Sequence, residues 1–161
     1  MDHSMDHQGP MLHDATIPRS ALLLGWLGVL PFAASCLVAV FGNADAAGLA
    51  LRALVVYGAI ILSFMGGAQW GLAMAAVGEG PSALARRLAV STLPALAAFG
   101  LAALASRTAL IGLAAVFAAL LVYDVSTARS GVAPPWYPAL RSQLTAAVVA
   151  CLLVAAAFGT A

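Results

Sequence analysis

Residues 53–77 read ALVVYGAIILSFMGGAQWGLAMAAV, and this stretch decides the fold. It contains no charged side chain, and Gln69 is the most polar residue of its second half. A helix needs about 20 consecutive, mostly apolar residues to cross the hydrocarbon core of a bilayer, because each residue advances the chain by about 1.5 Å. The stretch therefore predicts one membrane-spanning helix.

Four further apolar runs accompany it, each bounded by Arg, Gly or Pro. They cover residues 20–41, 88–105, 108–128 and 139–159. Strands of outer-membrane barrels are about ten residues long and alternate apolar with polar residues, whereas these runs are continuous and rich in Ala and Leu. We therefore expect an all-α fold, an integral membrane bundle of five transmembrane helices. It forms a single domain over residues 20–161, after a flexible N-terminal tail at residues 1–19.

The composition of the whole chain agrees with a membrane protein. Of its 161 residues, 63% are hydrophobic and only 8% are charged. Soluble domains average about 45–50% apolar and about 25% charged residues. The basic residues are scattered arginines with no patch that could neutralise phosphates. These features exclude an ordinary soluble enzyme, a disordered chain and a nucleic-acid-binding protein.

The arginines predict the orientation of the bundle. With five spans, the tail and the loops after the second and fourth spans share one side of the membrane. Five of the seven arginines fall on that side: Arg19, Arg86, Arg87, Arg129 and Arg141. Because cytoplasmic loops carry the excess of Lys and Arg, we expect the N-terminus inside and the C-terminus outside, in the inner (plasma) membrane of a bacterium.

Small residues recur at every fourth position of the second span. They are Ala59, Ser63, Gly67, Gly71 and Ala75. Residues with this spacing share one face of a helix, and small side chains allow another backbone to approach closely. The stripe therefore predicts a helix–helix contact face. A groove for a flat ligand, such as a quinone or a haem edge, is the alternative.

Polar residues within the spans are the best functional candidates, because they are costly in lipid. Gln69, followed by Trp70, lies deep in the second span, and Asp124 is the only acidic residue within a span. Arg141 opens the fifth span at the same membrane side, so we predict an Asp124–Arg141 ion pair. The amide of Gln69 must bond to another helix or to water, and we interpret it as a structural contact between helices. The alternatives are a ligand contact at Gln69 and a proton- or ligand-handling carboxylate at Asp124. No catalytic constellation is present, so we expect no enzyme.

The loop before the fifth span contains Trp136 and Tyr137. Trp and Tyr prefer the headgroup level of a bilayer, so these two residues are interpreted as interface anchors. Docking of a partner protein is the alternative.

The N-terminal tail carries all three histidines of the chain, and it begins Met1-Asp2-His3. A histidine in third position can bind Cu(II) together with the free amine and two backbone nitrogens. The repeat of Met-Asp-His adds His7. A weak copper site at His3 and His7 is therefore an alternative to a plain soluble leader. No other cofactor is predicted.

Three blocks of the sequence carry a family resemblance. They are residues 17–32 (IPRSALLLGWLGVLPF), residues 57–71 (YGAIILSFMGGAQWG), and Pro135-Trp136-Tyr137 with Leu140-Arg141 and Leu144-Thr145. Over roughly residues 17–155 the chain resembles an uncharacterised family of small multi-pass inner-membrane proteins that includes the mitochondrial transmembrane protein 69. The resemblance implies a helical inner-membrane protein and no established activity. The family usually carries an Ile-His-Trp-like stretch where this chain has Ala68-Gln69-Trp70.

Three functional hypotheses follow. The first is a non-catalytic accessory, assembly or stabilising subunit that packs against another membrane complex, for example a respiratory or other energy-converting one. The second is a transporter or binder of a small ligand or ion, with a cavity near Gln69 and Asp124. The third is a copper-handling accessory that uses the tail. The expected partners are the lipid bilayer and a membrane protein or a second copy of the chain, and no nucleic acid.

Overall fold

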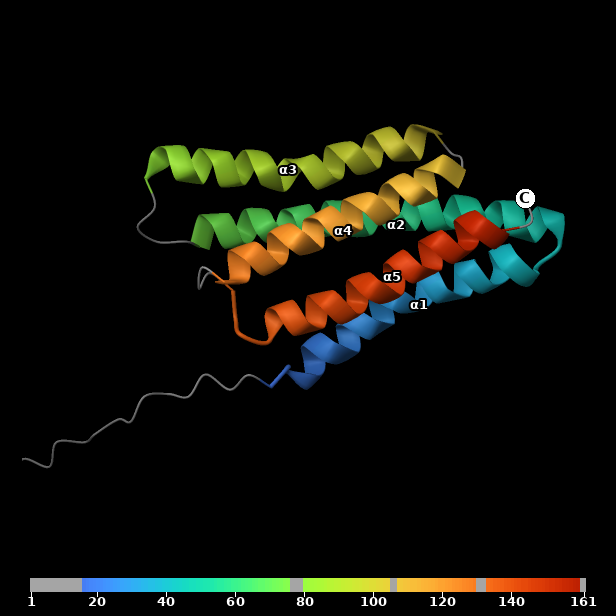
Figure 1. Cartoon of the computed structure of the whole chain (residues 1–161), viewed down its shortest axis with the longest axis horizontal. Helices are drawn as coiled ribbons and strands as arrows, with labels where there is room; N and C mark the ends of the chain where they lie inside the picture. Colours follow the sequence, from blue (N-terminus) through green and yellow to red (C-terminus); the bar gives the residue numbers. More distant parts are fainter. Residues whose placement is uncertain (1–15, 76–79, 105–106, 130–132, 160–161) are drawn as a thin grey trace, which may run out of the picture.

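The computed structural model describes residues 16–75, 80–104, 107–129 and 133–159, and in these ranges it contains five α-helices and no strand (Figure 1). The helices are α1 (Arg19–Phe41), α2 (Ala44–Ala75), α3 (Pro81–Leu104), α4 (Arg107–Arg129) and α5 (Tyr137–Phe158). Each is long and apolar enough to cross a membrane. The predicted all-α bundle of five membrane-spanning helices is therefore confirmed, whereas its orientation across the membrane stays a prediction.

Two helices begin earlier than the apolar runs predict. α2 begins at Ala44 rather than at Ala53, because Asn43 caps it: the Oδ1 atom of Asn43 accepts a hydrogen bond of 2.9 Å from the backbone N–H of Ala46. α3 begins at Pro81, a residue whose missing N–H is no loss in the first turn of a helix. Both starts are set by local backbone chemistry and not by hydrophobicity.

The five helices lie along one common axis, and consecutive helices run in opposite directions along it, so that the chain crosses the bundle five times (Figure 1). α1 packs against α5 and α2 packs against α3, while α4 lies between these pairs and contacts α2, α3 and α5. One end of the bundle holds the start of α1, the end of α2, the start of α3, the end of α4 and the start of α5. At the other end, an Nη2 hydrogen bond from Arg107 to the carbonyl oxygen of Gly159 joins the start of α4 to the end of α5.

The core is centred on Phe32 of α1, which is fully buried. Its ring lies 4.9 Å from the ring of Tyr57 on α2 and 6.1 Å from that of Phe117 on α4, measured between centroids. The Tyr57 hydroxyl in turn donates a hydrogen bond of 3.0 Å to the carbonyl oxygen of Gly28. These contacts hold α1, α2 and α4 together near the middle of α1.

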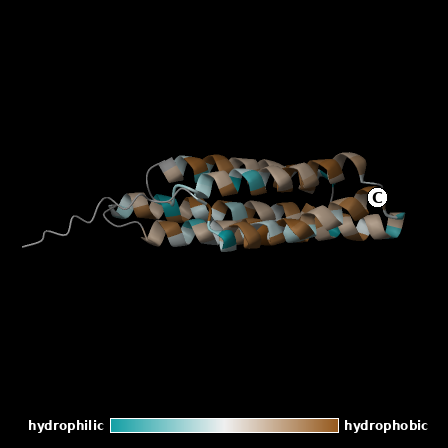
Figure 2. Cartoon of the chain, turned by 90° about the horizontal axis from the view of Figure 1, so that it is seen from below, coloured by the Kyte–Doolittle hydropathy of each residue, from teal (hydrophilic) through white to brown (hydrophobic). Residues whose placement is uncertain are grey.

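Large apolar side chains also cover the outside of the bundle. Figure 2 shows hydrophobic residues along the length of the helices, and Phe41, Phe99 and Val122 are among the most exposed ones. In water such a surface would be strongly unfavourable, because apolar area costs about 25 cal/mol per Å². The same surface is suited to contact with lipid chains.

The close approach of α2 and α3 uses Gly66. A Cβ atom on Gly66 would lie 2.6 Å from the carbonyl oxygen of Ser91, so the two backbones are nearly in contact there. The predicted stripe of small residues lies on a neighbouring face: Ser63, Gly67 and Gly71 are exposed, and no atom lies within 4 Å of a Cβ built on either glycine. Among the described helices, none packs against that part of the stripe.

Candidate functional site

Three polar side chains from three helices meet inside the bundle. The Nε2 amide of Gln69 on α2 donates a hydrogen bond to Oδ1 of Asp124 on α4. The Nε of Arg141 on α5 donates to Oδ2 of the same carboxylate at 2.7 Å, and this contact is also an ion pair. All three residues are buried, with exposed fractions of 5%, 2% and 7%. The predicted Asp124–Arg141 pair is present, and Gln69 completes the polar cluster.

The polar cluster, defined as Gln69, Asp124 and Arg141, is balanced in charge. The carboxylate of Asp124 carries one negative charge and the guanidinium of Arg141 one positive charge, so their sum is zero. Two charges taken out of water are tolerated only when they are paired and hydrogen-bonded, which the Nε and amide contacts of Asp124 provide. The phenol group of Tyr137 lies close to the same three residues. The polar cluster therefore joins α2, α4 and α5 near the start of α5.

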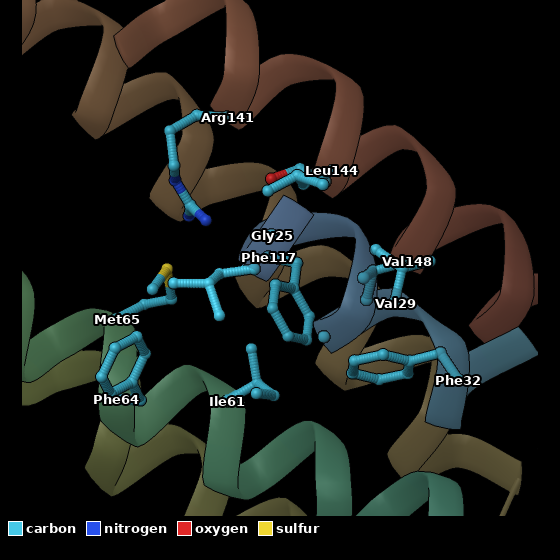
Figure 3. A pocket seen from close by; sticks show the side chains of 13 residues that line it. Gly25, Val29, Phe32, Ile61, Phe64, Met65, Phe117, Arg141, Leu144 and Val148 are labelled. Carbon is cyan, nitrogen blue, oxygen red and sulfur yellow. The ribbon is translucent and has the colours of Figure 1, made fainter. Parts of the chain in front are cut away.

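A cavity of about 140 Å³ lies beside the polar cluster (Figure 3). Its wall comes from α1, α2, α4 and α5, and Arg141 and Thr145 are the polar side chains in it. The apolar part of the wall includes Val29, Phe32, Ile61, Met65, Phe117 and Val148. The guanidinium group of Arg141 points toward this space in Figure 3. The site is therefore a hydrocarbon-lined cavity with polar groups on one wall only.

Two polar atoms at this wall have no hydrogen-bond partner within the described part of the chain. They are Nη2 of Arg141 and Oγ1 of Thr145, and Thr145 is only 3% exposed. Hydroxyl groups elsewhere in the helices, including those of Ser63 and Ser142, bond back to a carbonyl oxygen of their own helix. A buried polar group without a partner costs about 1–3 kcal/mol, so this pair needs an explanation.

The cavity opens between α1 and α2. Leu24 and Phe64 line it and are also 70% and 67% exposed, so they form its rim toward the lipid. On the α1 wall, a Cβ atom on Gly28 would meet nothing within 4 Å, whereas one on Gly25 would lie 2.6 Å from the side chain of Leu144. Gly28 thus leaves space in the cavity that any larger residue would fill.

Trp70 does not belong to the polar cluster, whereas Tyr137 lies close to it. Trp70 is 41% exposed, and its Nε1 donates to the sulfur of Met74 at 3.1 Å along the outside of α2. Trp136 and Tyr137 lie half-buried at the start of α5 with their rings 6.3 Å apart, and their role as interface anchors stays a prediction. His3 and His7 lie outside the described residues. Among the residues that are described, no group of three or more His, Cys, Asp or Glu side chains could hold a metal ion.

Thr145 is the site residue that sequence reasoning missed. One signal for it was available: Thr145 follows Arg141 by four residues, so the two side chains share a face of α5. A single threonine in an apolar helix is too common to single out without knowledge of the cavity.

Comparison with known proteins gives one match. The model of the family described as "Protein of unknown function (DUF3429)" matches residues 17–157. No curated protein and no solved structure matches the chain. The matched region covers the five helices except the last residue of α5, and it contains every residue of the polar cluster and the cavity wall. We conclude that the chain belongs to the DUF3429 family.

Proposed function

We propose that this multi-pass membrane protein binds, without catalysis, a small and mainly apolar molecule that enters the cavity from the bilayer. One observation carries the proposal: Arg141 and Thr145 line an apolar cavity, and Nη2 of Arg141 and Oγ1 of Thr145 are buried without a hydrogen-bond partner in the described part of the chain. A structural ion pair does not need the hydroxyl of Thr145, and it leaves Nη2 of Arg141 without an acceptor. Such costly groups call for an explanation, and a ligand in the adjacent cavity supplies one.

The shape and chemistry of the cavity favour binding over ion transport. An ion pathway needs polar groups along its whole length, whereas the wall beyond Arg141 and Thr145 is apolar. Small-molecule sites are typically apolar with a few polar groups that fix the orientation of the ligand. The rim at Leu24 and Phe64 faces the region where lipid chains lie, so the proposed ligand is lipid-soluble.

The variant Gly28→Leu is expected to abolish ligand binding. The leucine side chain would occupy part of the cavity that Gly28 lines. An added Cβ atom meets nothing within 4 Å, so we expect the fold to be retained. The measurement is mass spectrometry of compounds extracted from the purified protein. We expect one lipid-soluble compound to accompany the wild type at about one molecule per chain, and to fall at least tenfold in the variant.

Gly67→Leu is the matched control. Gly67 lies in the apolar helix α2 and, like Gly28, has nothing within 4 Å of an added Cβ atom, but it lines no part of the cavity. This variant should retain the compound. Equal retention by wild type and Gly28→Leu, or equal loss in both variants, would contradict binding in the cavity.

We propose an accessory role as a second function, on the outer face of α2. Ser63, Gly67 and Gly71 form an exposed surface of small residues, which would let a helix of another membrane protein approach closely. Such contact with a partner complex or a second copy is compatible with a ligand in the cavity, because Ser63, Gly67 and Gly71 line no part of the cavity.

The same two variants test this second function with their roles exchanged. Gly67→Leu is expected to remove any larger complex seen by native electrophoresis of mildly solubilised membranes, because Leu would hold a neighbouring helix away. Gly28→Leu should leave that complex intact. A complex that survives Gly67→Leu unchanged would exclude this face as the contact.

The finer assignments of the sequence stay predictions. These are residence in a bacterial inner membrane, copper binding by the tail through His3 and His7, and kinship with the mitochondrial transmembrane protein 69.

A further inference from the structure

The unpartnered groups of the cavity also restrict the chemistry of its ligand. Arginine nitrogens only donate hydrogen bonds, so Nη2 of Arg141 requires an acceptor. Thr145 lies one helical turn further along α5 on the same face, and its hydroxyl also donates. An oxygen atom with two lone pairs, placed between them, would satisfy both groups. The ligand must therefore present an oxygen acceptor toward α5.

The charge balance of the polar cluster disfavours an anionic acceptor. The positive charge of Arg141 is already neutralised by Asp124 through the 2.7 Å contact, and no other charged side chain lines the cavity. A carboxylate or phosphate would leave the site with a net negative charge in a medium of low dielectric constant, which is strongly unfavourable. A neutral acceptor, such as a carbonyl oxygen, avoids this cost.

The size and the rim of the cavity restrict the rest of the ligand. A cavity of about 150 Å³ with apolar walls binds one benzene-sized ring, and this one measures about 140 Å³. The rings of Phe32 and Phe117 form part of its wall and suit a flat apolar molecule. A hydrocarbon tail would leave between Leu24 and Phe64, which are both largely exposed.

We propose that the cavity binds the ring of a neutral, lipid-soluble carbonyl compound of the quinone class. One ring carbonyl accepts hydrogen bonds from Arg141 and Thr145, and the tail lies in the bilayer. This inference rests on the proposed function, because it assigns the ligand class of the same cavity. The ester carbonyl of a membrane lipid offers the same acceptor, but its glycerol and two chains exceed the volume of one ring.

The test measures equilibrium binding of a benzoquinone with a ten-carbon tail to the full-length protein in detergent. Thr145→Val keeps the side-chain shape and removes the hydroxyl, so the Kd should rise about 5- to 10-fold, as expected for one lost hydrogen bond. Thr92→Val is the control, since Thr92 bonds to the carbonyl oxygen of Ala89 on α3 and lines no part of the cavity. Its Kd should equal that of the wild type.

Folding of the Thr145→Val variant is checked by its melting temperature. Because the variant removes a buried hydroxyl that has no partner, its melting temperature without ligand should equal or exceed that of the wild type. A Kd unchanged by Thr145→Val in a protein with normal melting would overturn the inferred hydrogen bond.

Two further arms separate the ligand classes. Both arms measure displacement of the labelled benzoquinone from the protein. Ionised palmitate at pH 8 should displace it at least tenfold less effectively than unlabelled benzoquinone does, and so should a diacyl phosphatidylcholine. Displacement by palmitate at the same concentration as unlabelled quinone would contradict the inference that the ligand's acceptor is neutral. Displacement by the phospholipid would identify a lipid ester as the ligand instead. In both cases, sensitivity to Gly28→Leu would leave the proposed function standing. If Gly28→Leu affected no ligand, the proposed function would fail as well.

Discussion

Asp124→Asn is expected to lower the free energy of unfolding in detergent by about 3–5 kcal/mol, the usual cost of breaking a buried ion pair from one side. The variant leaves the guanidinium of Arg141 buried at 7% exposure with no negative charge beside it. The asparagine has nearly the shape of aspartate, so the loss reports charge and not packing. Thermal unfolding, followed by circular dichroism in detergent, measures the effect.

The double variant Asp124→Asn with Arg141→Gln decides whether this loss comes from the pair. Once Asp124 is neutral, removing the charge of Arg141 should cost little further, because the unpaired charge is then gone. Strictly additive losses would mean that the two residues do not interact. Asp45→Asn is the control: Asp45 is an exposed acid in the first turn of α2, and its loss should cost at most about 0.5 kcal/mol.

Gly66→Ala and Gly67→Ala are expected to change stability in opposite directions. At Gly66 the added Cβ would lie 2.6 Å from the carbonyl oxygen of Ser91, which is backbone and is held within α3. The helices α2 and α3 must then separate, at a cost of about 1–3 kcal/mol. At Gly67 the Cβ meets nothing within 4 Å, so the better helix propensity of Ala should add about 0.5–1 kcal/mol.

Thermal unfolding of both glycine variants under identical conditions gives the comparison. The two positions are adjacent in one helix and receive the same methyl group, so differences in detergent or expression cancel. If Gly66→Ala were as stable as Gly67→Ala, α2 and α3 would not approach as closely as the contact between Gly66 and Ser91 requires.

The number and type of helices were predictable because a long, continuous apolar run in a membrane satisfies its backbone hydrogen bonds by forming a helix. Hydrophobicity nevertheless marks the part of a helix that lies in lipid and not its ends. The starts at Ala44 and Pro81 therefore needed the capping chemistry of Asn43 and the special place of proline in a first turn.

The face of α2 that packs was not predictable from small residues alone. The sequence offers Gly66 and Gly67 side by side, and each belongs to a series with a spacing of four residues. One series contains Gly58, Leu62 and Gly66, which are buried; the other contains Ser63, Gly67 and Gly71, which are exposed. Which series turns inward depends on where α3 and α4 lie, and this is a property of the assembled bundle.

The Asp124–Arg141 pair was predictable because buried charge needs a partner, and Asp124 had Arg141 at the same membrane side. The hydrogen bond from Gln69 to Asp124 was not among the predictions. The cavity was not predictable, since its wall is shared by α1, α2, α4 and α5 and depends on how these four helices assemble. The roles of Gly28 and Thr145 in the wall of the cavity therefore could not be predicted from the sequence.

The polar cluster also bears on the order in which the protein is made. Its three members lie on α2, α4 and α5, so a ribosome completes Gln69 first, then Asp124, and Arg141 last. An acidic residue costs about 2.5–3.5 kcal/mol at the centre of a helix during insertion by the translocon, and Asp124, which lies nearer the end of α4, incurs part of this cost. Asp124 is therefore synthesised before Arg141, its partner in the ion pair. Gln69, which donates a hydrogen bond to Asp124, has been synthesised by that time. We therefore expect α4 to become fully stable in the membrane only once α5 supplies the missing charge.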